Sequence, residues 1–115
     1  MHEVSIVEAL FEQVWREVDR SGQPGRVTRL DLVIGRFSGV NADSIRFAFR
    51  LLAPGTLLES ARLEIAEPKA ECLCRDCHRR GELDEMVGCC PYCGSPAIQI
   101  QGGQDLLLQS IELEE

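Results

Sequence analysis

Residues 72 to 94 read CLCRDCHRRGELDEMVGCCPYCG and contain all six cysteines of the 115-residue chain. Two Cys-x-x-Cys pairs, Cys74/Cys77 and Cys90/Cys93, lie in this stretch with twelve residues between them. A two-residue gap lets both thiolates of a pair bind one ion from a tight turn, and two such turns form a tetrahedral site with metal–sulfur bonds of about 2.3 Å. The stretch therefore predicts a structural zinc site formed by these four cysteines.

The remaining cysteines and the alternative chemistries have to be weighed against this site. Cys72 and Cys89 are interpreted as spare thiols, because Cys89 directly precedes Cys90 and adjacent side chains do not readily face one ion. A disulfide framework would require secretion, and the chain opens without a signal peptide. Iron is the second alternative, because tetrahedral sulfur also suits iron and Cys-Pro-x-Cys-Gly resembles the knuckles of rubredoxins.

Basic residues surround the cysteines, namely Lys69, Arg75, Arg79 and Arg80. Four thiolates around a divalent ion carry a net charge of about minus two. These side chains could offset that charge, or they could belong to a solvated loop; both interpretations stay open at this point.

Length and charge limit the classes of function. With 115 residues the chain has room for one small core, and the cysteine-rich stretch has too few apolar residues to fold without a metal. The net charge of -7 disfavours contact with nucleic acid phosphates. No apolar run approaches the roughly 20 residues that span a bilayer. We expect a cytoplasmic protein that binds neither nucleic acid nor membrane.

The first half of the chain predicts two helices and a strand. Apolar residues from Val4 to Val18 recur at about the helical period, which indicates an amphipathic helix that ends near Ser21-Gly22. Within residues 27–34, Leu30, Leu32 and Ile34 fall on one side and Arg29, Asp31 and Val33 on the other, which indicates a strand with one buried face. Asn41 is a good N-cap for a second helix that continues through Leu52.

The second half predicts three more strands, over residues 61–67, 98–101 and 104–114. The last of them has apolar residues at both parities, which suits a strand covered on both faces or one with a bulge. A chain that leaves a sheet at Pro68 and returns at Gly103 makes the segment between them an insertion.

The predicted fold class is α+β, with a small mixed three-stranded sheet, two helices and an inserted zinc-ribbon module. Residues 1–68 together with 103–115 are expected to form an α/β domain. Residues 69–102 are expected to form the zinc-binding module, called the cysteine module from here on.

The chain has few residues that could catalyse a reaction, because it has two histidines and no nucleotide-binding loop. We therefore expect that the protein is not an enzyme. His2 stands beside the α-amine of Met1. The amine, the next backbone nitrogen and the imidazole can enclose one metal ion in fused chelate rings. Square-planar nitrogen coordination suits copper(II) and nickel(II). The alternative is a terminal histidine without a function.

The combination of these motifs resembles the HypA/HybF family of nickel metallochaperones. The resemblance is carried by Met1-His2-Glu3 before an amphipathic helix, by the two cysteine knuckles, and by the apolar tail over 106–112. It implies a structural Zn(II) at Cys74, Cys77, Cys90 and Cys93. It also implies transient Ni(II) at His2 with Glu3 and the α-amine of Met1, and nickel delivery to a nickel-iron hydrogenase large-subunit precursor with an accessory GTPase.

Some relatives in that family add a histidine near the end of the zinc module as a nickel ligand. The residues around Ile98 offer none. Glu3 is therefore our first choice for the fourth nickel ligand, and His78 is the alternative.

Two hypotheses from other classes compete with a nickel carrier. One is a zinc-ribbon adaptor that binds a protein partner without transferring nickel, and the other is a rubredoxin-like iron electron carrier. For the leading hypothesis we expect a monomer or a weak dimer.

Overall fold

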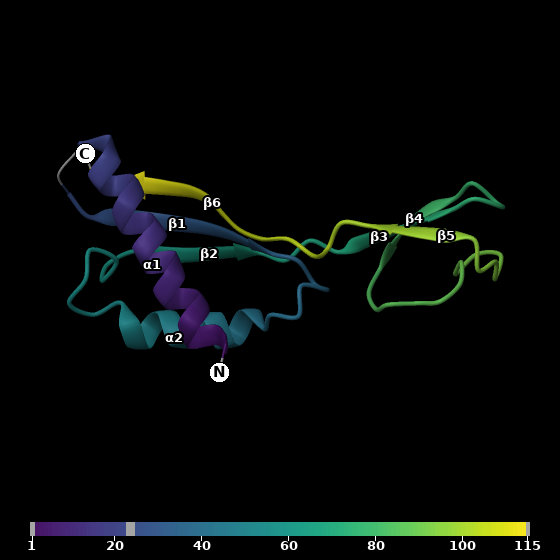
Figure 1. Cartoon of the computed structure of the whole chain (residues 1–115), viewed down its shortest axis with the longest axis horizontal. Coiled ribbons are helices and arrows are strands. Elements are labelled where there is room, and N and C mark those ends of the chain that lie inside the picture. Colours follow the sequence, from purple (N-terminus) through teal and green to yellow (C-terminus); the bar gives the residue numbers. More distant parts are fainter. Residues whose placement is uncertain (1, 23–24, 115) are drawn as a thin grey trace.

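The computed structural model describes residues 2–22 and 25–114, apart from the side chain of His2. Its elements are α1 (His2–Ser21), β1 (Val27–Ile34), α2 (Ala42–Leu52), β2 (Arg62–Ala66), β3 (Ala70–Cys74), β4 (Arg80–Leu83), β5 (Ile98–Gln101) and β6 (Leu106–Leu113). The molecule is elongated, with extents of 55 × 28 × 17 Å. Both helices and the first sheet lie at one end of the long axis, and the cysteine module lies at the other (Figure 1).

The first sheet has the strand order β2-β1-β6. β1 pairs with β2 in parallel and with β6 in antiparallel orientation, so the sheet is mixed, as predicted. β1, α2 and β2 form one crossover unit, the usual way to join two parallel neighbours. The predicted α+β class is confirmed.

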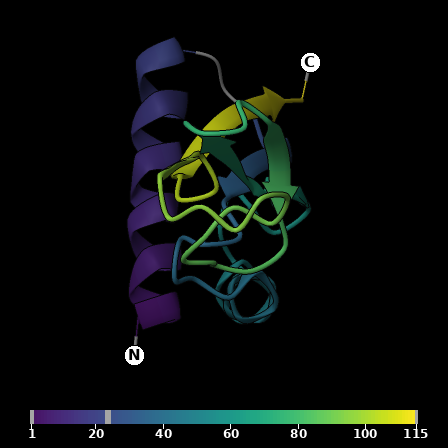
Figure 2. The same ribbon diagram turned by 90° about the vertical axis from the view of Figure 1, so that its right-hand side faces the viewer.

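The helices cover one face of this sheet. Leu30, Leu32 and Ile34 of β1 are buried there, and they belong to one core with residues from both helices, including Val7 and Ile45. Viewed along the long axis, α1 stands beside the strands, and α2 appears end-on near the start of α1 (Figure 2). The helices therefore meet at the end of α1 that carries the predicted nickel residues.

Helix limits follow local sequence signals. The side chain of Asn41 accepts a hydrogen bond from the backbone N–H of Ser44 at 3.0 Å, which caps α2 as predicted. α1 begins at His2 and ends at Ser21. No helix among the described residues combines the length and the apolarity needed to cross a bilayer.

β6 has the predicted bulge. Its register against β1 shifts between the pairs Asp31/Ser110 and Leu32/Leu108, so Gln109 has no partner across the ladder. Coverage on both faces, the other expectation, is wrong, because the side chains of Leu106 and Leu107 are 44% and 45% exposed.

The cysteine module contains a second sheet, with the order β4-β3-β5. Of its strands, the sequence predicted β5 alone. β3 was missed because its alternating residues include Cys72 and Cys74, and a cysteine-rich stretch indicates metal chemistry rather than a strand. β4 was missed because it is short and largely polar. Here the tertiary pairing of β3 with both neighbours outweighs weak local preference.

The loop after β1 connects the helix-covered sheet to the cysteine module through hydrogen bonds. The backbone N–H of Gly35 donates to the carbonyl of Asp105 at 2.7 Å, and that of Phe37 donates to the carbonyl of Gly103 at 2.6 Å. The N–H of Arg36 donates to the carbonyl of Pro68 at 3.0 Å. Both connections of the cysteine module are thus bonded to one loop of the first part.

Candidate metal centre

Two matched turns present the four predicted cysteines. In the first, the backbone N–H of His78 donates to the carbonyl of Cys74 at 3.1 Å, and in the second the N–H of Gly94 donates to that of Cys90 at 2.9 Å. His78 and Gly94 both have positive φ, at 62° and 78°. Glycine adopts this conformation freely, whereas histidine does so at a cost. Each Cys-x-x-Cys pair therefore ends in the same left-handed step.

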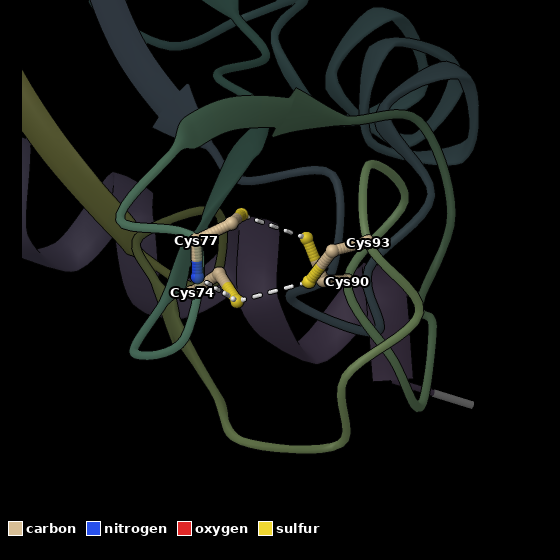
Figure 3. Close-up of side chains that lie close together, drawn as sticks. All are labelled: Cys74, Cys77, Cys90 and Cys93. Atoms are coloured by element: carbon tan, nitrogen blue, oxygen red, sulfur yellow. Dashed lines mark hydrogen bonds between the residues drawn. The ribbon is translucent and has the colours of Figure 1, made fainter.

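The four sulfurs converge on one point (Figure 3). The Sγ atoms of Cys74 and Cys93 are 3.6 Å apart and those of Cys77 and Cys90 are 3.7 Å apart. All four sulfurs lie within 4.8 Å of one another, and none is in a disulfide. A tetrahedron with metal–sulfur bonds of about 2.3 Å has edges of about 3.8 Å. The arrangement fits a single tetrahedral ion.

The electrostatics of the cluster favour a cation. Burial raises the pKa of Cys90, but hydrogen bonds from the backbone N–H groups of Cys93 and Tyr92 outweigh it and hold this pKa at about 6. The backbone N–H of Ser95 lowers the pKa of Cys93, but desolvation and the neighbouring thiols raise it to about 12. Four thiols this close cannot all ionise by themselves. A divalent ion would hold all four as thiolates, which is the state that ligates metal.

Structural support behind the turns was not predicted. The hydroxyl of Ser95, in the second turn, donates to the carboxylate of Asp76 in the first. The same hydroxyl accepts the backbone N–H of Ala97 at 3.0 Å. These polar residues lie in loops, and no sequence signal separates them from solvated ones. They join the backs of the two turns.

The two remaining cysteines do not belong to the four-sulfur group. Cys72 is buried and points to the same side of β3 as Cys74, while Cys89 is exposed. This is the division that the sequence predicted. That Cys74, Cys77, Cys90 and Cys93 are zinc ligands stays a prediction.

The basic residues near the cysteines have other partners. Lys69 forms an ion pair with Asp84 at 2.8 Å. Arg80 forms one with Glu71 on the neighbouring strand at 3.8 Å. The guanidinium of Arg79 stacks over the ring of Tyr92, 5.2 Å from its centroid. Ion pairing and stacking therefore explain the positions of these three basic side chains. Neither interaction was predicted from the sequence.

The predicted nickel residues lie at the start of α1, which the fold places beside α2 and away from the cysteine module (Figure 1). Met1 and the side chain of His2 lie outside the described part of the structure. Glu3 is half-buried, and it lines a groove between the two helices together with Asp43, Ser44 and Phe47. His78, the alternative nickel ligand, belongs to the first cysteine turn.

Comparison with known proteins decides the family. The profile described as "Hydrogenase/urease nickel incorporation, metallochaperone, hypA" matches residues 1–113. The chain belongs to the HypA family. The resemblance inferred from the sequence is thereby confirmed, and the family is one of metallochaperones that incorporate nickel.

Individual HypA proteins match along the whole chain. The Hydrogenase maturation factor HypA of Rippkaea orientalis is 40% identical over 115 residues, which cover 100% of this chain and 97% of the relative. That of Chlorobium limicola is 38% identical over 115 residues, covering 100% and 98%. These relatives are maturation factors for hydrogenases.

Solved HypA structures share the fold. The solution structure of the Ni metallochaperone HypA from Helicobacter pylori superposes with a TM-score of 0.61 at 26% identity, and it covers 96% of both chains. A second solution structure of a HypA protein has a TM-score of 0.66 at 27% identity, covering 99% of this chain and 97% of the other. Both likenesses extend over the helices and the cysteine module.

Proposed function

We propose that this chain binds Ni(II) at its N-terminus and delivers it to the large-subunit precursor of a nickel-iron hydrogenase. The carrier acts in the cytoplasm, without catalysis, and with an accessory GTPase as its second partner. Membership of a nickel-incorporating family is the observation that carries the proposal. The HypA relatives named as hydrogenase maturation factors support hydrogenase as the client.

The start of α1 at His2 suits the proposed nickel ligands. The first four backbone N–H groups of a helix have no acceptor within the helix. The amide nitrogen of His2 can therefore lose its proton to a metal without breaking a helical hydrogen bond. Together with the α-amine of Met1 and the imidazole of His2 it supplies three nitrogens, and Glu3 supplies a fourth ligand.

The same location favours release. The N-terminus of a helix carries a partial positive charge, which opposes a bound cation, and the acidic side chain of Glu3 in the first turn offsets part of it. All proposed ligands come from three consecutive residues. Moving these residues on partner contact would dismantle the site while the helix core stays in place. A site that can be taken apart in this way suits a metal ion that has to be released to a partner.

The cysteine module is proposed to hold Zn(II) as a resident ion at Cys74, Cys77, Cys90 and Cys93. The sulfur spacings fit the group, as shown above. Four protein ligands close a tetrahedral site, and zinc in such sites supplies folding energy rather than chemistry. Residues 69–102 would then be the zinc-binding module, and residues 1–68 with 103–115 the nickel-binding domain.

Isothermal calorimetry of the untagged, zinc-loaded protein tests the proposal. The wild type is expected to bind one nickel ion, and His2→Ala is expected to abolish that binding with unchanged zinc content. Glu8→Ala, an exposed change two turns further along α1, is the matched control and should bind nickel as the wild type does. Equal one-to-one binding by wild type and His2→Ala would overturn the mechanism and favour the adaptor hypothesis.

The iron hypothesis is tested by the same preparation. Four sulfurs around a tetrahedral ion suit iron as well as zinc. Zinc is d10 and colourless, whereas a four-thiolate iron site absorbs visible light. A colourless protein with one zinc per chain is the expected result, and a red protein would instead indicate an electron carrier.

A further inference from the structure

β6 forms an open edge of the first sheet (Figure 1). One side of its ladder pairs with β1. Besides these bonds to β1, the backbone groups of residues 106–113 have one further partner in the described part of the chain. It is the hydroxyl of Thr28, which donates to the carbonyl of Glu112 at 3.2 Å. A row of peptide N–H and C=O groups on the outer side is thus free to pair with another strand.

A groove runs beside this edge, between β6 and α1. It consists of two adjoining hollows of about 390 and 250 Å³, which share Gln13 and Leu108. On the helix it extends from Ile6 to Ser21, and on the strand from Leu106 to Leu113. The smaller hollow is largely apolar, because Leu106 and Leu108 lie on the helix side of the sheet, in register with Ile34 and Leu32. The larger hollow has both apolar and polar residues in its lining.

The two edges of the sheet differ in how they are protected. β2, at the opposite edge, has five residues and carries Arg62 and Glu64, the kind of charge that discourages pairing. β6 has eight residues, and its single charged side chain, Glu112, lies 3.5 Å from Arg29 on the neighbouring strand. A long apolar edge without charges pointing outward is the type that another chain covers.

The charges near β6 indicate what kind of polypeptide could pair with this edge. The chain has no lysine or arginine after Arg80, and Asp105 and Glu114 flank β6, whereas Glu17 in the groove forms an ion pair with Arg20 at 3.4 Å. A second copy that paired through its own β6 would bring these acidic groups together, which costs free energy. An extended segment with basic residues at its ends would instead be attracted.

We propose that β6 accepts a fourth strand from a partner polypeptide, namely an extended apolar segment with basic flanks. Its backbone pairs with the free edge, and its alternate side chains fill the groove beside α1. The groove begins at Ile6, one helical turn or about 6 Å beyond His2. A bound partner therefore has one end near the first turn of α1. That consequence for nickel transfer rests on the proposed function, whereas strand addition does not.

Amide hydrogen exchange with a synthetic peptide tests the proposal on the zinc-loaded full chain without nickel. The probe is the ten-residue peptide KKVTVTVTKK. At saturation we expect the amides of β6 that do not pair with β1 to exchange at least tenfold more slowly, with no change in β2. The peptide EEVTVTVTEE tests charge, and a version with proline in place of each threonine tests backbone pairing. Each should bind at least tenfold more weakly.

Two variants locate the site. Leu106→Lys places a charge that points into the groove on a side chain that is already 44% exposed, and it should weaken peptide binding at least tenfold. Phe47→Lys, at a comparably exposed apolar side chain on α2, is the control and should bind as the wild type does. Thermal unfolding verifies that both variants are folded.

Three results would overturn the inference. They are unprotected β6 amides at saturating peptide, undiminished binding by Leu106→Lys, and protection of β6 that rises with protein concentration without peptide, which would identify a second copy as the occupant. Because nickel is absent throughout, failure here leaves the calorimetric test of nickel binding independent.

Discussion

The cysteine module and the start of α1 present metal ligands in opposite ways. In the module, four sulfurs from two turns separated by twelve residues are held within 4.8 Å by a sheet and by hydrogen bonds between the turns. At the start of α1, the proposed ligands are three consecutive residues at a chain end. A closed site assembled from distant residues retains its ion as long as the fold persists, whereas a local site can be dismantled alone. The proposed function therefore assigns a resident metal to the module and a cargo metal to the start of α1.

The largest expected effect is the unfolding of the cysteine module with the helical part of the protein still folded. Cys90→Ala removes a buried thiol of the four-sulfur group and leaves three thiols close together, so zinc affinity should be lost along with metal-derived folding energy on the order of 10 kcal/mol. Zinc analysis and hydrogen exchange should show an unfolded 69–102 region with a protected β1. Cys89→Ala, at the exposed neighbour, is the control and should retain zinc. Loss of zinc in Cys89→Ala with retention in Cys90→Ala would show that the ligand register is wrong.

An intermediate effect is expected at the joint between the two parts. A Cβ atom at Gly35 would lie 2.2 Å from the carbonyl oxygen of Gly103, a backbone atom that cannot easily move. Gly35→Ala should therefore destabilise the protein by about 2 kcal/mol, read as a lower midpoint in urea unfolding. Gly88→Ala is the control, because nothing lies within 4 Å of its Cβ position. An unchanged midpoint in Gly35→Ala would mean that the close approach does not exist in solution.

The smallest expected effect comes from a substitution at His78, which tests whether the cysteine module and the nickel site are separate. This residue has a φ of 62°, where a side chain costs about 1 kcal/mol and glycine costs little. His78→Gly should leave nickel stoichiometry unchanged and raise the stability of the zinc-loaded module slightly. Chemical denaturation and calorimetry measure the two properties. Loss of nickel binding in this variant would make His78 a nickel ligand and contradict the separation of the two sites.

Local signals explain what the sequence predicted well. β1 occupies residues 27–34 as expected, because Leu30, Leu32 and Ile34 recur at every second position and form one buried face. α2 follows the cap of Asn41. The four cysteines come together because each pair is set by a tight turn within four residues, which leaves a single long-range contact to form. The bulge in β6 was one of two expectations, and the parity of its apolar residues could not distinguish them.

Long-range contacts explain what the sequence missed. β4 has almost no apolar residues, and its partner strand decides its conformation. The contact of Gly35 with Gly103 and the ion pair of Lys69 with Asp84 join segments far apart in the chain or across a hairpin, and nothing at either residue identifies the other. The open edge of β6 likewise becomes visible only when the strand order is known.

Native mass spectrometry of the zinc-loaded protein during a nickel titration tests most directly that the chain holds two metals at two independent sites. A species with one zinc and one nickel is expected for the wild type, and a species with zinc alone is expected for His2→Ala at the same nickel concentration. If nickel instead appeared with loss of zinc, and did so equally in both proteins, nickel would be entering the cysteine cluster. That result would contradict the division between a resident and a cargo metal.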